Sequence, residues 1–417
     1  MFRNNIISLK KPLENVEDPL MSVLQEGARQ LLAHALETEV QLFKEKYQEL
    51  RLSDGSPQVV KNGTLPKRSL QTGIGPIDVE VPRIKDRGRS GITFQSALVP
   101  PYLRRTKNIE ELLPILYLKG ISTGDFEETL ASLVGEKAIG LSHSTICRLK
   151  QSWEKDFDLW NKRSLIKKKY VYFWVDGVYL QARMEEKQCL LVIIGADEFG
   201  KKDLVAVQDG FRECEHSWTE VLLDLKQRGL EVGSRLATGD GSLGFWKALR
   251  KVYPTTKEQR CWVHKTANIL SKLPKTLHSK AKVHLHDIWL NETKEEAERS
   301  FEFFLKCYID KYPKAVMCLQ KDKDRLLEFY NFPAEHWVHI RTTNPIESTF
   351  ATVRLRTEKT KGCLSRQTAL TMTFKLLQSA EKRWVKLKGS HRIAEVVTGI
   401  NFVNGIAQKH PQQRVAA

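Results

Sequence analysis

Three acidic residues, far apart in the chain, have the surroundings expected of metal ligands. Asp176 interrupts an apolar, β-branched and aromatic run at residues 170–182, where a carboxylate lowers strand propensity and must be desolvated unless a cation compensates it. Asp240 lies between two glycines at the predicted end of a short strand, where small neighbours let a backbone or a phosphate come close. Glu347 stands in the run 342–347, at the predicted start of a helix.

Carboxylates suit Mg²⁺ and Mn²⁺, because both cations prefer hard oxygen ligands. Three acidic groups can hold two such ions and leave positions for water and a phosphate. The two ions would activate an attacking water or 3′-hydroxyl and stabilise the leaving oxygen of an in-line displacement. We therefore expect Asp176, Asp240 and Glu347 to be metal ligands and catalytic residues, with two Mg²⁺ (or Mn²⁺) ions per active site. Hydrolysis and strand transfer are both open to such a site.

Each of these residues also has a purely structural interpretation. Asp-Gly, which occurs at 176–177 and at 240–241, is an ordinary turn sequence. Asn344 as N-cap, Pro345 as first helical residue and Glu347 at the third position match a capping box. The two interpretations of Glu347 are compatible, because a carboxylate in a first helical turn can point back toward a metal at a strand end.

The segment around Asp176 and Asp240 reads as an α/β core. Strands are predicted at 170–175 with a continuation at 178–182, at 190–194, at 204–207 and at 230–237, and a helix at about 214–227. The order β-β-β-α-β, with carboxylates at the first and fourth strands, is the layout of a ribonuclease-H-like fold.

Strand signals are absent from residues 243–341, where helical periodicity dominates. Helical stretches are predicted at 246–252, 262–270, 295–308 and 314–328. A stretch of this length is more than a loop, so we expect an all-helical insertion domain at 246–340. It would divide the core into a first part, 166–245, and a second part, 341–400, that carries the helix of Glu347; residues 401–417 would be a C-terminal tail.

Three further regions are predicted before the core. Residues 1–60 form a helical region for DNA binding or dimerisation, in which 19–49 reads as one or two amphipathic helices. Residues 61–100 form a small β-hairpin followed by a basic arm. This basic run, a strand end or an arm, is either a solvated edge or a phosphate contact, and it contains Arg83, Lys85, Arg87 and Arg89.

Residues 101–165 carry three short helical segments, at 109–119, 124–134 and 143–155. They suit a helix-turn-helix-like DNA-binding region whose last helix enters a major groove and turns Arg148 and Gln151 toward DNA. A plain three-helix linker domain fits the same pattern.

The composition indicates a folded, basic protein. Of 417 residues, 67 are Lys or Arg and 50 are Asp or Glu, a formal net charge of +17 that attracts nucleic acid. A ribosomal or merely basic protein is the alternative that charge alone leaves open. With no apolar run long enough for a bilayer and no signal-peptide pattern, we expect a cytoplasmic, nucleoid-associated protein without membrane contact. Seven scattered cysteines predict reduced thiols.

Four motifs in order resemble one family. They are Trp174-Val175-Asp176-Gly177, Asp240-Gly241, the run 259–268 that contains Cys261 and His264, and Thr343-Asn344-Pro345-Ile346-Glu347-Ser348 with Arg354 and Arg356. The chain resembles, over about residues 20–400, the mutator-type transposases of bacterial insertion sequences and their eukaryotic Mutator relatives. The resemblance implies an acidic-triad (DDE) transposase in which Asp176, Asp240 and Glu347 are the triad, on a ribonuclease-H-like core with a helical insertion.

The pair Cys261-x-x-His264 leaves several interpretations open. As a zinc site it lacks a second clear pair, although Cys214 and His216 could complete it. The resemblance places the pair beside the active site, which makes Cys261, His264 and Asn344 supporting residues. A packed cysteine and a hydrogen-bonded histidine at a helix start is the structural alternative.

Basic residues near the triad are candidate phosphate contacts. Arg354 follows Glu347 by two helical turns, so both lie on the same face of the predicted helix. This placement fits either a contact with DNA phosphates or a basic helix exposed to solvent. The predicted DNA-binding residues are Arg148, Gln151, His264, Lys265, Arg354, Arg356, Lys359 and Lys361.

The function expected from these patterns is binding of terminal inverted repeats, followed by metal-dependent cleavage and transfer of DNA strands into target DNA. Synapsis of two ends implies a homodimer or higher assembly. A non-catalytic, domesticated DNA-binding regulator is the main alternative, and a nuclease acting on RNA–DNA hybrids is another.

Overall fold

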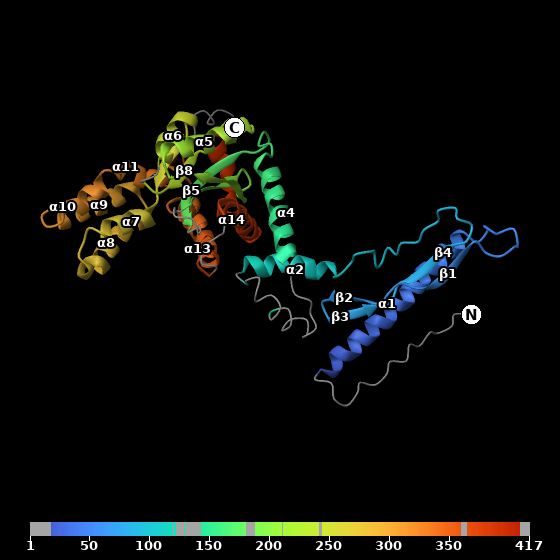
Figure 1. Cartoon of the computed structure of the whole chain (residues 1–417). Helices are drawn as coiled ribbons and strands as arrows, with labels where there is room; N and C mark the ends of the chain where they lie inside the picture. The colour runs from blue at the N-terminus through green and yellow to red at the C-terminus, as the bar shows by residue number, and fades with distance from the viewer. Residues whose placement is uncertain are drawn as a thin grey trace, which may run out of the picture. The chain divides into compact units, whose positions relative to one another are not determined.

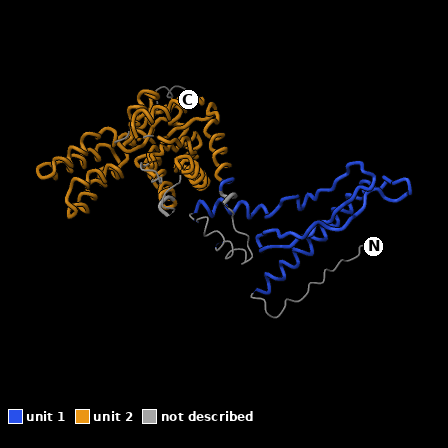
Figure 2. The backbone as a smooth tube through the Cα atoms, in the orientation of Figure 1, with its two compact units in different colours: residues 1–149 blue, residues 150–417 orange. Residues whose placement is uncertain are grey.

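The computed structural model describes residues 18–119, 121, 129, 143–180, 188–210, 212–241, 244–359 and 365–408. The chain separates into two units, residues 1–149 and residues 150–417 (Figure 2). None of the helices within the described ranges combines the length and the apolar character that crossing a membrane demands.

The second unit is built on a five-stranded mixed sheet in the order β7-β6-β5-β8-β9, of which Figure 1 labels β5 and β8. The strands are β5 (Tyr170–Leu180), β6 (Gln188–Asp197), β7 (Lys202–Gly210), β8 (Leu236–Gly239) and β9 (Lys257–Arg260). β5, β6 and β7 pair antiparallel, whereas β8 runs parallel to both β5 and β9. The predicted strands at β5, β6 and β7 and the intervening helix are confirmed, whereas β8 begins at Leu236 and not at residue 230 and ends two residues later than predicted.

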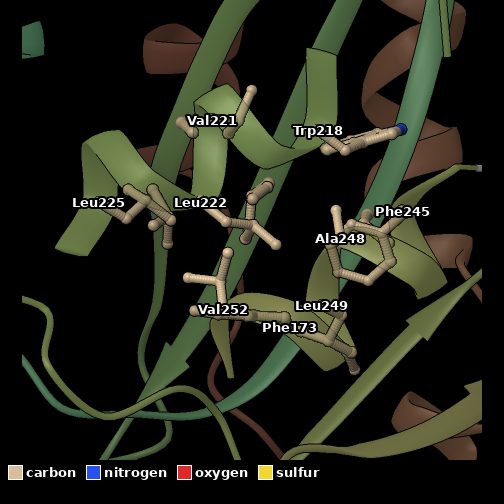
Figure 3. Close-up of a cluster of buried hydrophobic side chains, with 14 of the residues drawn as sticks. Phe173, Trp218, Val221, Leu222, Leu225, Phe245, Ala248, Leu249 and Val252 are labelled. Carbon is tan, nitrogen blue, oxygen red and sulfur yellow. The ribbon is translucent and has the colours of Figure 1, made fainter. Parts of the chain in front are cut away.

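Helices cover both faces of this sheet, which explains why β5 and β6 are almost continuously apolar. On one face, α5 (Glu215–Gln227) and α6 (Phe245–Val252) pack Trp218, Leu222 and Leu249 around Phe173 of β5 (Figure 3). On the other lie α13 (Asn344–Lys359) and α14 (Arg366–Glu381) (Figure 1). The molecule is therefore an α/β protein in this unit.

A run of helices separates β9 from α13, as predicted for the insertion. It comprises α7 (Trp262–Leu270), α8 (His278–Leu290), α9 (Lys294–Tyr308), α10 (Pro313–Gln320), α11 (Lys323–Leu326) and α12 (Trp337–Ile340), with short 3-10 turns at Lys275–Leu277, Glu328–Asn331 and Ala334–His336. The expectation that residues 243–341 hold no strand is wrong, because β9 pairs with β8 at the sheet edge. The domain boundaries themselves stay predictions.

The first unit packs one long helix on short strands. α1 (Pro19–Lys46) is a single helix whose Leu36 joins a core with Leu70, Ile77 and Val79. Two antiparallel pairs are nested: β2 (Arg68–Thr72) with β3 (Gly75–Val79), and β1 (Val59–Thr64) with β4 (Pro82–Asp86). The hairpin prediction is confirmed.

Of the predicted basic strand end or arm, Arg83 and Lys85 lie within β4, which pairs with β1, and Arg87 and Arg89 follow that strand. After this sheet come α2 (Lys107–Leu118) and α4 (His143–Asn161). The predicted middle helix, 124–134, falls outside the described residues apart from Thr129, so the helix-turn-helix stays a prediction. At the end of the second unit lie α15 (Ile393–Val397) and the small pair β10 (Phe402–Val403) and β11 (Ile406–Ala407).

The packing of the second unit predicts that replacing two different phenylalanines by alanine lowers the free energy of unfolding by very different amounts. Phe173 is fully buried, whereas Phe199 is 67% exposed. We expect Phe173→Ala to cost about 3–5 kcal/mol of unfolding free energy, since it removes contacts and leaves a cavity. Phe199→Ala should change it by only about 0.5 kcal/mol. Urea unfolding followed by tryptophan fluorescence measures both, and equal midpoints for the two variants would contradict this packing.

Candidate active site

Parallel pairing of β5 with β8 places two of the predicted acidic residues level with one another. Trp174 pairs with Thr238 and Val175 with Gly239, so the next residues along the two strands are Asp176 and Asp240. Side chains alternate along a strand, so Asp176 points to the face opposite Val175 and away from α5 and α6. The sheet itself thus brings the two carboxylates to one place.

The same face of the sheet carries the segment that leads to Glu347. The Trp174 indole donates to the carbonyl of His339 at 2.8 Å, and the Thr238 hydroxyl donates to the carbonyl of Ile340 at 2.6 Å. These bonds fix residues 339–340 over β5 and β8, and α13 begins four residues later. Glu347, in its first turns, therefore comes to the two aspartates from the side of α13.

The start of α13 differs from the predicted capping box by one residue. Asn344, predicted as the N-cap, is the first residue of the helix and is exposed. Thr343 stands before it, and its carbonyl accepts the backbone N–H of Glu347 at 3.0 Å. The Thr343 hydroxyl also lies 2.5 Å from Glu347 Oε1. With Thr343 before the first helical residue, Glu347 is the fourth helical residue and not the third, so the predicted capping box is wrong; the Thr343 hydroxyl contacts the Glu347 carboxylate and orients it.

Thr343 links Glu347 to the Cys261 and His264 pair. Cys261 is the N-cap of α7 and is fully buried. Its Sγ accepts the backbone N–H of Thr343 at 3.3 Å and lies 3.2 Å from the Thr343 hydroxyl. His264 Nδ1 lies 3.3 Å from that hydroxyl and 3.5 Å from Glu347 Oε1. The predicted supporting role of Cys261 and His264 thus has a direct geometric basis.

The electrostatics show acidic groups crowded in a poorly solvated place. Burial, with smaller contributions from the charges of Glu347 and Asp240, raises the pKa of Asp176 to about 6 against the opposing charge of His264. Hydrogen bonding with Cys261, aided by Asp240 and Asp176, raises the pKa of His264 to about 9 against the effect of burial. Hard oxygen donors that repel one another in this way fit Mg²⁺ or Mn²⁺.

Glu213 is a fourth carboxylate at this place, and sequence reasoning missed it. Burial, with the charges of Asp176 and Asp240, raises its pKa to about 7. Its side chain passes over Gly177, where an added Cβ would lie 2.2 Å from Glu213 Oε1. The sequence signal that could have identified Glu213 is its position just after the third predicted strand. The first and fourth predicted strands of the same sheet also carry carboxylates.

Gly241, the glycine after Asp240, makes room for the buried side chain of Arg260. Arg260 is buried, and its guanidinium occupies the space that a Cβ on Gly241 would need. One of its nitrogens lies 3.7 Å from Asp240 Oδ1 and 3.7 Å from Asp322 Oδ2. The space beside Asp240, expected to admit a backbone or a phosphate, is on this side filled by Arg260.

The predicted DNA-binding residues fall into different settings. Arg148, Gln151 and Arg354 are exposed on their helices. Lys265 is buried, donates to the carbonyl of Cys318 at 2.8 Å and forms an ion pair with Asp322, so its prediction as a DNA contact is corrected.

Arg356 is also buried, which removes it from the surface that DNA would touch. The side chain of Lys359 and the whole of Lys361 lie outside the described residues. Cys214 and His216, considered above as a completing zinc pair, are exposed and are not grouped with Cys261. Within the described ranges, Cys261 and His264 instead form a group of possible metal ligands with Glu347.

Comparison with known proteins places this arrangement in a family. The family model described as Transposase, Mutator family, matches residues 8–386. The chain belongs to the Mutator family of transposases. The transposase for insertion sequence element IS6120 of Mycolicibacterium smegmatis is 48% identical over 304 residues, which cover 73% of this chain and 94% of the relative.

Two further transposases extend this comparison. The transposase for insertion sequence element IST2 of Acidithiobacillus ferrooxidans is 49% identical over 287 residues, 67% of this chain and 95% of the relative. The transposase for insertion sequence element IS905 of Lactococcus lactis subsp. lactis is 27% identical over 360 residues, 86% of this chain and 88% of the relative. The resemblance inferred from four motifs is thereby confirmed.

The raised pKa of Asp176 predicts a pH-dependent stability in this transposase. The folded chain holds the proton of Asp176 up to about pH 6, whereas an ordinary aspartate loses it near 3.8. The free energy of unfolding therefore falls as pH rises through this window. Asp176→Asn removes that loss, so in EDTA its free energy of unfolding should exceed that of the wild type by an amount that grows between these pH values, up to about 3 kcal/mol, and its Tm should rise accordingly.

Thermal unfolding at a series of pH values measures the effect. Asp158→Asn, at an exposed carboxylate of α4, is the matched control and should leave the pH profile unchanged. A constant difference between Asp176→Asn and wild type at every pH would show that the carboxylate is not desolvated.

Proposed function

We propose that this transposase is of the acidic-triad (DDE) type. Asp176, Asp240 and Glu347 hold two Mg²⁺ (or Mn²⁺) ions and catalyse cleavage and transfer of DNA strands at the terminal inverted repeats of an insertion sequence. The main support for the proposal is that Asp176 and Asp240 follow paired positions of β5 and β8, and that the charges of Asp240 and Glu347 both act on Asp176. Within the described residues the oxygens of the three carboxylates do not form a group as tight as that of Cys261, His264 and Glu347, so the proposal requires the bound cations to draw them together.

The sheet supports a ribonuclease-H-like core as the scaffold. Three antiparallel strands are followed through α5 by a parallel strand next to the first, and a fifth strand completes the edge. This is the layout expected from the sequence, now with its fifth strand. The helices between β9 and α13 would then be an insertion that separates the third carboxylate from the first two.

The chain's own residues would contribute positions and charge. Bound cations would supply the activation of water or 3′-hydroxyl and the stabilisation of the leaving oxygen. Asp176 and Asp240 present their oxygens from adjacent rigid strands. Thr343 and His264 hold Glu347 in one orientation, and Arg260 limits how far Asp240 can move. Preorganised ligands of this kind lower the cost of assembling the reacting groups.

DNA contacts are proposed in both units, each by itself. In the first unit a groove of about 1530 Å³, lined largely by apolar residues, also carries arginines that suit a phosphate backbone. They are Arg68, Arg83, Arg104, Arg105 and Arg148. In the second unit, exposed Gln151 and Arg354 are the candidates. The net charge of +17 favours both, and synapsis of two element ends on the nucleoid would need a homodimer or higher assembly.

Conservative substitutions of the triad test the catalytic proposal. Asp176→Asn, Asp240→Asn and Glu347→Gln should each abolish cleavage and joining of end-containing DNA in Mg²⁺ or Mn²⁺, because each removes a metal-binding charge and keeps the shape. DNA binding, measured by gel shift, should persist. Asp158→Asn should retain activity. Full activity in a triad variant would remove that residue from the site, and a wild-type chain that binds but never cleaves would favour the non-catalytic regulator.

Thr343 offers a sharper test of how Glu347 is held. Thr343→Val keeps the shape and deletes the hydroxyl 2.5 Å from Glu347, so we expect cleavage to fall about 10-fold or more, with rescue by Thr343→Ser. Thr342→Val is the matched control, since the neighbouring buried hydroxyl has no hydrogen-bond partner within the described part of the chain. A similar loss in both variants would point to general destabilisation.

A further inference from the structure

We propose that Cys261, His264 and Glu347 form a site for a thiophilic cation of the Zn²⁺ class, distinct in ligand chemistry from the carboxylate sites. Binding there would inhibit the enzyme, because it takes Glu347 away from the catalytic ions. The binding itself does not depend on the proposed function; only the inhibition rests on it.

The positions of the three ligand atoms carry this inference. Cys261 Sγ, a ring nitrogen of His264 and a carboxylate oxygen of Glu347 all lie within 4.8 Å of one another. A tetrahedral zinc ion with bonds of about 2.0–2.3 Å separates its ligands by roughly 3.3–3.8 Å, and the 3.5 Å between His264 Nδ1 and Glu347 Oε1 already matches this spacing. A small inward movement of the ligands would complete the contact.

Two helix starts hold these ligands in place. Cys261 and His264 are three residues apart at the beginning of α7, so one helical turn brings both to the same side. Glu347 lies near the beginning of α13, and the backbone N–H of Trp262 donates to the carbonyl of Arg341 at 3.1 Å, which ties the two segments together. The site is therefore built by the fold and does not need a loop to close.

The surroundings of the sulfur suit a thiolate ligand. Thr343 presents its backbone N–H at 3.3 Å and its hydroxyl at 3.2 Å from Cys261 Sγ, which is the kind of support that stabilises a metal-bound thiolate. On binding, the cation would replace the proton of the thiol and that of the imidazolium, and both protons would go to solvent. Mg²⁺, which avoids sulfur, has no reason to enter this site.

Co²⁺ is the probe that tests the ligands directly, because Co²⁺ bound to a thiolate gives a charge-transfer band together with ligand-field bands in a tetrahedral site. We expect the full-length chain to bind one Co²⁺ with this spectrum and Zn²⁺ to displace it. Cys261→Ser should abolish the thiolate band, and His264→Asn should weaken Co²⁺ binding about 10-fold or more. Cys214→Ser and His216→Asn, at exposed positions, are the matched controls and should leave the spectrum unchanged.

Absence of a thiolate band in the wild-type chain, or its persistence in Cys261→Ser, would overturn the site. Circular dichroism shows whether each variant is folded. If Cys261→Ser does not fold, His264→Asn decides: undiminished Co²⁺ binding in that variant also overturns the proposal.

Inhibition is tested by titrating Zn²⁺ into Mg²⁺-supported cleavage, with each variant compared to its own zinc-free rate. Half-inhibition of Cys261→Ser should need about 10-fold more Zn²⁺, or higher, than that of the wild type. Equal sensitivity would overturn the inhibitory role and leave the binding result standing. Unimpaired cleavage by the triad variants would instead defeat the proposed catalytic function, and the Co²⁺ spectrum of the wild-type chain would still stand.

Discussion

The parallel pairing of β5 with β8 is the constraint on which the candidate site depends. It forces Asp176 and Asp240 to the same level of a sheet that is buried on both faces. Burial, with repulsion from Asp240 and Glu347, makes the charge of Asp176 costly, as its pKa of about 6 indicates. A fold has no structural reason to create such a place, since an apolar residue at 176 would pack better there. The cost of the arrangement is therefore itself an argument for a cationic ligand.

The helices after β9 also contribute to the site, through buried cations. Lys265 of α7 and Arg260 of β9 both approach Asp322, which precedes α11, and Arg260 in turn reaches Asp240. Asp322 of the helical segment thus pairs with two cationic side chains, Lys265 and Arg260. Arg260 also lies beside Asp240, a proposed metal ligand. Because an unpaired buried charge is strongly destabilising, these contacts lock the helical segment to the edge of the sheet.

Features that arise from local sequence patterns could be predicted, whereas features that arise from contacts between residues far apart in the sequence could not. Unbroken apolar runs predict β5 and β6, because strands buried on both faces need them. β9, with the sequence Lys-Glu-Gln-Arg, has no such signal and is a strand only because β8 pairs with it. The burial of Lys265 could not be predicted either, since its partner Asp322 is 57 residues away. The roles of Glu213 and Thr343 likewise arise from contacts that only the folded chain brings together.

His264 explains how three carboxylates can stay assembled before any cation arrives. Its raised pKa, about 9, keeps the ring charged at neutral pH, and Nδ1 stands 3.5 Å from Glu347 Oε1. The imidazolium thus neutralises part of the repulsion, while Thr343 fixes the rotamer of Glu347. A divalent cation bound as proposed would meet ligands held by the fold, so its binding free energy would act against residual repulsion more than against chain entropy. A thiophilic cation bound as proposed to Cys261 and His264 would first have to displace the proton of the charged ring, so its binding would strengthen as pH rises.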